Sequence, residues 1–194
     1  YGTMHGASKG KNVKLRREIP IAIRECMNHE GLHGALVSHG SSTVPQYIVD
    51  EINALGGAIQ NAYGISKEEL KAAIPCGISK INVDTDIRLA VTRNLRELFR
   101  DRPELKTDAR IGGVWELLDK NRAAFDPRAF LPPLMDTVMY GTGDDGTVAL
   151  ITDAMRRGVR EAVGTLIVEF GSVGRAPLVE LAGLDEMAAR YAKE

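Results

Sequence analysis

Apolar positions along residues 1–100 alternate between a spacing of three to four residues and short continuous runs. The first pattern predicts amphipathic helices, and the second predicts buried strands. On this basis we expect strands at residues 34–39 and 77–84, and helices at 44–55, 66–74 and 87–98. This order of strand, helix, strand and helix is typical of right-handed βαβ units on a parallel sheet.

Local signals mark where the predicted helices begin and end. Pro45 suits the first turn of a helix, and the Gly-Gly pair at 56–57 stops the same helix. Ser66 and Glu69 have the spacing of a capping box, and Pro75 breaks the helix that they start. The predicted elements of this half are therefore short and closely connected.

Residues 101–194 have a different pattern. Helical spacing recurs at 111–120, 134–139 and 148–163, and in a short final helix around Met187 and Tyr191. Thr165–Phe170 is rich in residues that favour strands, so we expect an extended segment there, followed by a Gly-rich loop at 171–174. We therefore expect two parts, with βα units in residues 1–100 and a mostly helical extension packed on them in residues 101–194.

Polar and chemically active side chains occur where three predicted strands end. His5 and Gly6 follow the first strand, His39 closes the second, and Asn82 and Asp84 lie at the end of the third. Because the carboxyl ends of parallel strands meet at one face of a sheet or barrel, these side chains are expected to converge. Imidazole suits Zn²⁺, but a catalytic zinc takes three protein ligands, so two histidines leave the set one short.

The residues after His39 add a second kind of chemistry. Gly40, Ser41 and Ser42 lead into a predicted helix, and small residues at a helix N-terminus suit a phosphate group. A structural interpretation stays open for each strand end. The histidines would then be hydrogen-bonded core side chains, Gly40–Ser42 a simple turn, and Thr85 or Asp86 the cap of the next helix. The coincidence of three such strand ends favours the ligand site.

Composition narrows the class of protein. The 194 residues include 25 Lys and Arg and 26 Asp and Glu, a formal net charge of −1, so we expect no nucleic-acid partner. Two cysteines without a CxxC pair fit a reducing, cytoplasmic setting. No apolar run approaches the ~20 residues of a membrane span. The first residue is Tyr1 rather than Met, which favours a fragment or a processed chain.

Three motifs together resemble class II fructose-bisphosphate aldolases in order and spacing. They are Gly2-Thr-Met-His-Gly-Ala-Ser-Lys9, Ser38-His-Gly-Ser-Ser-Thr-Val-Pro45 and Ile81-Asn-Val-Asp-Thr-Asp-Ile-Arg88. Phe125-Asp-Pro-Arg128 looks like a further family marker, and the tail resembles the longer bacterial variants. The set of three is much more specific than any one motif.

The resemblance implies the C-terminal part of an α/β fold, about strands 6–8 of a (β/α)₈ TIM barrel, plus a mostly helical C-terminal extension. It implies a lyase that uses Zn²⁺ to cleave fructose 1,6-bisphosphate to dihydroxyacetone phosphate and glyceraldehyde 3-phosphate. His5 and His39 match two of the three zinc ligands. A monovalent cation is also compatible with such a site.

The resemblance assigns the substrate contacts to three groups of residues. The dihydroxyacetone phosphate end matches Gly6, Lys9, Gly40, Ser41 and Ser42. The substrate hydroxyls and the same phosphate match Asn82, Val83, Asp84 and Thr85. The other phosphate matches Arg88 and Arg128, with Arg128 reaching in from a neighbouring subunit of a homo-oligomer, a dimer or a tetramer. Arginine forks suit phosphate, and a carboxylate such as that of Asp84 accepts hydrogen bonds from hydroxyls.

Two functional groups of the family cannot be placed in this sequence. They are the acid/base Asp directly before the first zinc His, and a Glu in a mobile loop. No catalytic residue is therefore assigned, and we expect the chain alone to be inactive. Two alternatives stay open: a tagatose 1,6-bisphosphate aldolase, whose substrate differs at one hydroxyl, and a non-catalytic phosphate-binding half-barrel. Asp84 favours fructose by resemblance.

Three weaker candidates compete with this site. His29 and His33 have a helical metal-binding spacing, but the glycine between them favours a solvated helix end. Lys80 is a candidate for a Schiff base, which two strand-end histidines make unnecessary. Gly171-Ser-Val-Gly-Arg175 is a lone glycine motif, for which a turn is the simpler interpretation.

Overall fold

A computed structural model describes residues 13–140, 146–179 and 182–192. Within these ranges, β1 (Leu36–Ser38) and β2 (Ile78–Ile81) form a parallel two-stranded sheet. Leu36 pairs with Ile78, and Ser38 with Ile81, with one irregularity of register between them. Helices α2 (Gln46–Ala54) and α3 (Lys67–Ala73) connect the two strands, which confirms the predicted βαβ order.

Most of the described residues are helical. Helix α1 (Glu18–His29) precedes the sheet, and α4 (Thr85–Asp101) follows it. The remaining α-helices are α5 (Gly112–Lys120), α6 (Met135–Tyr140), α7 (Thr147–Glu169) and α8 (Leu184–Tyr191). Short 3₁₀ helices are η1 (Ile74–Cys76), η2 (Pro103–Thr107), η3 (Pro127–Ala129), η4 (Pro132–Leu134) and η5 (Ala176–Leu178). None of the helices described is long and apolar enough to cross a bilayer.

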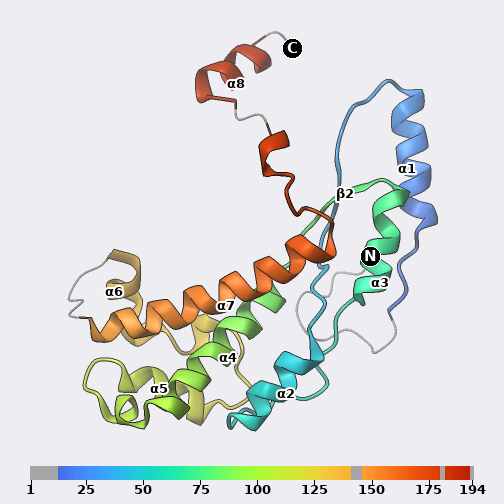
Figure 1. Ribbon diagram of the computed structural model, residues 1–194. Helices are drawn as coiled ribbons and strands as arrows, with labels where there is room; N and C mark the ends of the chain where they lie inside the picture. The colour runs from blue at the N-terminus through green and yellow to red at the C-terminus, as the bar shows by residue number, and fades with distance from the viewer. Residues whose placement is uncertain (1–12, 141–145, 180–181, 193–194) are drawn as a thin grey trace.

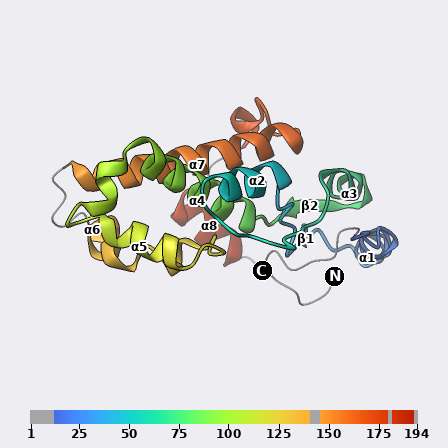
Figure 2. The same ribbon diagram turned by 90° about the horizontal axis from the view of Figure 1, so that it is seen from below.

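Helices α4 and α7 lie side by side along the middle of the molecule (Figure 1). In both views α5 and α6 lie at one end of this pair, and the sheet lies with α1 and α3 at the other (Figure 2). The largest apolar cluster joins α4 and α7 to residues 105–134, with Phe99, Phe130 and Ile151 fully buried. Helix α4 contributes to this cluster and also follows β2, so it connects the two parts predicted from the sequence. Their division at residue 100 stays a prediction.

A second apolar cluster fixes the position of the loop after β1. It joins that loop and α2 to α4 and α7 through Val44, Ile48, Val49, Ile52, Ile59, Ala62, Leu89, Ala90 and Ala162. Burial of this many aliphatic side chains holds the start of α2 against the start of α4. The segments that follow the two strands are therefore supported by apolar contacts among α2, α4 and α7.

Two sequence predictions of secondary structure are wrong in detail, and one helix was missed. Residues 165–169 are not extended but continue α7, and Glu169 is held there by Lys67 and Lys71 at 3.0 and 3.1 Å. The strand predicted to reach Asp84 ends at Ile81. Helix α1 is not predicted at all, because its isoleucines recur at every second position of the sequence. At the end of α7 these long-range ion pairs outweigh a weak local preference.

Candidate functional site

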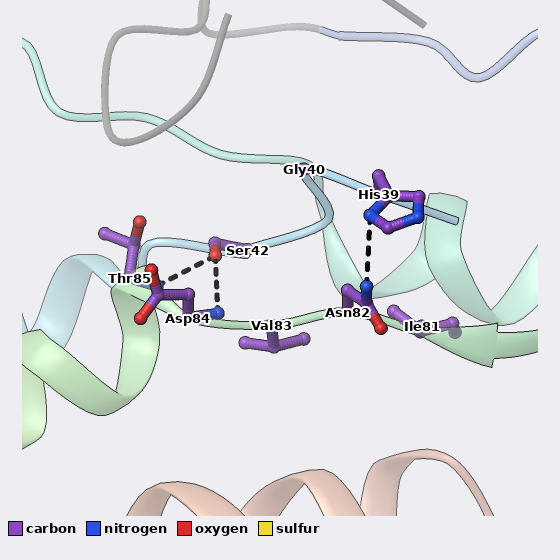
Figure 3. A pocket seen from close by; sticks show the side chains of 8 residues that line it. All are labelled: His39, Gly40, Ser42, Ile81, Asn82, Val83, Asp84 and Thr85. Atoms are coloured by element: carbon purple, nitrogen blue, oxygen red, sulfur yellow. Dashed lines mark hydrogen bonds between the residues drawn. The ribbon is translucent and has the colours of Figure 1, made fainter. Parts of the chain in front are cut away.

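A pocket of about 490 Å³ lies where β1 and β2 end (Figure 3). Its lining comes from the segments that follow the two strands: His39, Gly40, Ser42, Ile81, Asn82, Val83, Asp84 and Thr85. All of these except Ile81 are residues that the sequence analysis proposed for metal or substrate. The structure thus brings the second and third predicted strand ends together.

Backbone hydrogen bonds continue the sheet into the pocket wall. The Asn82 N–H donates to the Ser38 carbonyl oxygen at 2.9 Å, and the Ser41 N–H donates to the Asn82 carbonyl oxygen at 3.2 Å. The hydroxyls of Ser38 and Ser41 lie 2.7 Å apart and are buried. Ser41, proposed as a substrate contact, therefore lies beneath the pocket, where it ties the two segments together.

Asn82 orients the imidazole of His39. The Nδ2 atom of Asn82 lies 3.1 Å from Nδ1 of His39 (Figure 3). In this contact the amide N–H donates to Nδ1, which places the imidazole proton on Nε2. Rotation of the amide by 180° would place its oxygen there instead, where it would accept a proton from Nδ1 and leave the Nε2 lone pair for a metal. The rotated arrangement is the usual one for a metal-binding histidine and fits the donor chemistry of zinc.

Ser42 caps the helix that follows the other strand. Its Oγ accepts hydrogen bonds from the N–H groups of Asp84 at 3.1 Å and Thr85 at 3.0 Å. The side chain of Asp84, the N-cap residue of α4, makes no capping bond of its own. The predicted alternative, a cap by Thr85 or Asp86, is therefore wrong. The N-terminus of α4 and its partial positive charge lie at the pocket, an arrangement that suits an anion.

Asp86 holds the loop after β1 and was missed as a functional residue. Asp86 is 3% exposed, and its carboxylate accepts hydrogen bonds from Thr43 N at 3.1 Å, Thr43 Oγ1 at 2.7 Å and Val44 N at 2.9 Å. Val44 is buried at a φ of 51°, which is strained for a β-branched residue. The only sequence signal is the position of this acid two residues after Asp84.

Two arginines and two carboxylates form a network at the rim of the pocket. Arg88 donates to Asp84 through Nε at 2.8 Å and through Nη2 at 2.7 Å, and it also pairs with Asp126. Arg128 donates through Nη2 to Asp126 at 2.6 Å. The two arginines proposed for one phosphate thus share a carboxylate within a single chain. The side chain of Arg128 is 75% exposed, so it is accessible to a ligand.

This network predicts a low titration midpoint for Asp126. The hydrogen bond from Arg128, with help from Arg88, lowers the pKa of the Asp126 carboxyl to about 2. A lowered pKa means that the pairing stabilises the fold at pH values above ~4, where an unfolded Asp is ionised, and that this contribution disappears as pH falls toward 2. A titration followed by carboxyl ¹³C NMR should show the low midpoint, and Arg128→Gln should raise it. A midpoint near 4 in the parent chain would contradict the network.

Of the remaining candidates from the sequence, none that the structure describes joins this pocket. His5, Gly6 and Lys9 lie outside the described residues. His29 and His33 are exposed, and no cluster of three or more His, Cys, Asp or Glu suited to a metal occurs among residues that the structure describes. Lys80 is exposed on β2, and Gly171 and Gly174 form turns with φ near 70° after α7.

A parallel βαβ unit with an imidazole and a helix N-terminus at the strand ends defines a ligand site typical of α/β enzymes. Comparison with known families identifies which one. The sequence model of fructose-bisphosphate aldolase class-II matches residues 1–174, so the chain belongs to the class II fructose-bisphosphate aldolase family.

Individual relatives agree with this assignment. The chain is 30% identical over 191 residues to fructose-bisphosphate aldolase 2 of Cereibacter sphaeroides, and the aligned region covers 98% of this chain and 43% of the relative. It is 32% identical over 192 residues to the fructose-bisphosphate aldolase of Nostoc sp., covering 99% and 42%. The Thermus caldophilus enzyme of the same name is 36% identical over 182 residues, covering 90% and 43%. The chain therefore spans less than half the length of these curated relatives.

Proposed function

We propose that this chain supplies the part of a metal-dependent aldolase site that binds the substrate ketone and the phosphate next to it. The reaction is cleavage of fructose 1,6-bisphosphate to dihydroxyacetone phosphate and glyceraldehyde 3-phosphate. The observation that carries this proposal is the convergence of His39, Gly40–Ser42 and Asn82–Thr85 on one pocket in a chain of the class II family. The barrel to which these βα units would contribute is part of the same proposal.

The metal proposed for this site is Zn²⁺, held by His39 and by His5. When bound, zinc polarises the substrate carbonyl and stabilises the negative charge that develops as the carbon–carbon bond breaks. In this chain the Asn82 amide lies against Nδ1 of His39, and with its oxygen turned toward the ring it would fix the ring for that role. The third ligand and the acid/base are not assigned to any residue of this sequence.

The chain's own residues would bind and orient the two ends of the sugar. The backbone around Gly40 and Ser42 and the N-terminus of α4 would hold the phosphate next to the ketone. Asp84 would accept hydrogen bonds from substrate hydroxyls, and Arg88 and Arg128 would hold the distal phosphate as bidentate donors. For the distal phosphate to bind, the contacts of both arginines with Asp126 must rearrange. That Arg128 acts across a subunit interface of a homo-oligomer stays a prediction.

Cleavage of the bisphosphate by the intact gene product tests the proposal. We expect activity that EDTA abolishes and zinc restores, because the metal stabilises the transition state. The assay couples reduction of the product dihydroxyacetone phosphate to NADH oxidation, with tagatose 1,6-bisphosphate as the competing substrate. Activity that survives EDTA, together with borohydride trapping of substrate on Lys80, would replace the zinc mechanism with a Schiff base. Phosphate binding without cleavage would support the alternative of a non-catalytic, phosphate-binding half-barrel.

A further inference from the structure

A short segment that ends at Ile65 lies against the loop that carries Ser42. The Ile65 N–H donates to the Ser42 carbonyl oxygen at 3.0 Å. The Nε2 atom of Gln46 adds a bridge, because it donates to the carbonyl oxygens of Val44 and Ala62, each at 2.9 Å. The loop after β1 is therefore held on this side as well as by the Asp86 carboxylate.

Gly64 makes this contact unusually close. A Cβ atom at Gly64 would lie 2.2 Å from the Ser42 carbonyl oxygen, and 2.5 and 2.6 Å from the carbonyl carbon and oxygen of Thr43. These are backbone atoms, so no side-chain rotation relieves the overlap, and the loop itself would have to move. The Ser42 hydroxyl in turn accepts the N–H groups of Asp84 and Thr85. A displaced loop therefore changes both walls of the pocket.

We propose that Gly64 is a positioning residue for the phosphate-binding wall of the pocket, acting through Ser42. The identity of the ligand, a sugar phosphate, rests on the proposed function, whereas the close approach rests on the geometry alone. Binding of a phosphate requires several N–H donors to point at it together, and small displacements of such donors weaken binding strongly. A residue that touches no ligand thereby sets the affinity.

Two glycine variants separate positioning from stability. Gly64→Ala forces the loop after β1 away from residue 64. Gly158→Ala is the control, because it introduces a Cβ only 2.6 Å from the Ala90 carbonyl oxygen in the contact between α4 and α7. Both should lower the unfolding midpoint. Calorimetric titration of the chain with dihydroxyacetone phosphate, below both midpoints, should give a Kd raised at least ~10-fold for Gly64→Ala only. An unchanged Kd for Gly64→Ala, or an equal rise for Gly158→Ala, overturns the proposal.

Amide exchange distinguishes failure of this proposal from failure of the proposed function. Without ligand, Gly64→Ala should speed exchange of the Asp84 and Thr85 N–H groups, and Gly158→Ala should not. If the parent chain binds no dihydroxyacetone phosphate, the proposed function fails, and the exchange rates still decide the role of Gly64. If Gly64→Ala does not fold, Gln46→Ala removes the adjoining bridge and should raise both exchange rates. Unchanged rates in the folded variant overturn the role of this segment.

Discussion

Under the proposed function, replacing His39 with alanine should remove zinc from the intact gene product and, with the zinc, its aldol cleavage. His39 lines the pocket, and Asn82 holds its ring by a contact of 3.1 Å to Nδ1. Loss of a partner behind a metal ligand costs ~10- to 100-fold in affinity, so loss of the ligand itself should exceed ~100-fold. Zinc content after dialysis, and competition with a chromophoric chelator, measure the effect.

Two further variants make this test specific. His33→Ala removes an exposed imidazole that lies outside the pocket and should retain zinc and activity. Asn82→Ala frees the His39 ring and should lower zinc affinity by about tenfold, at the lower end of the effect of outer partners. Full zinc content in His39→Ala would exclude His39 from the metal site.

Asp86→Ala should be the most destabilising single change at the site. The substitution leaves the N–H groups of Thr43 and Val44 and the Thr43 hydroxyl without their shared acceptor, in a loop that already holds Val44 at a φ of 51°. Donors left unsatisfied cost about 1–3 kcal/mol each, with partial relief from water at the half-buried Thr43. We expect the free energy of unfolding to fall by about 2–4 kcal/mol. Urea denaturation followed by circular dichroism measures the change.

An exposed acid on the neighbouring helix provides the control for Asp86. Asp50 lies on the solvent side of α2, and Asp50→Ala should change the free energy of unfolding by less than ~0.5 kcal/mol. Asp86→Asn keeps an acceptor but loses the charge, so its effect should lie between the two. If Asp86→Ala and Asp50→Ala unfold at the same urea concentration, Asp86 does not hold the loop.

Local sequence signals predicted the parts of the fold that depend on neighbouring residues. The N-cap half of the predicted capping box forms, since the Ser66 hydroxyl accepts the Glu69 N–H at 3.2 Å. The Glu69 carboxylate instead accepts hydrogen bonds from Lys14 and from the Leu15 N–H. The order of strands and helices around the pocket also follows from apolar spacing. Because strand ends of a parallel sheet meet at one edge, His39 and Asn82 were expected to be neighbours, and their side chains are in contact.

Long-range contacts account for what the sequence did not predict. The end of α7 has strand-favouring residues, but Lys67 and Lys71 from a distant helix hold Glu169 in place. Likewise, nothing near Gly64 or Asp86 in the sequence indicates that both lie against the loop after β1. Such roles depend on residues that are adjacent only after folding.

The cap of α4 by Ser42 has a consequence for the order of folding. The hydroxyl and the two N–H groups that it accepts are 42 and 43 residues apart in the chain. The first turn of α4 therefore gains its capping bonds only when the segment after β1 reaches it, which requires closure of a long loop. The pocket wall and the sheet should consequently form in one cooperative step, late relative to the local helix at Ser66.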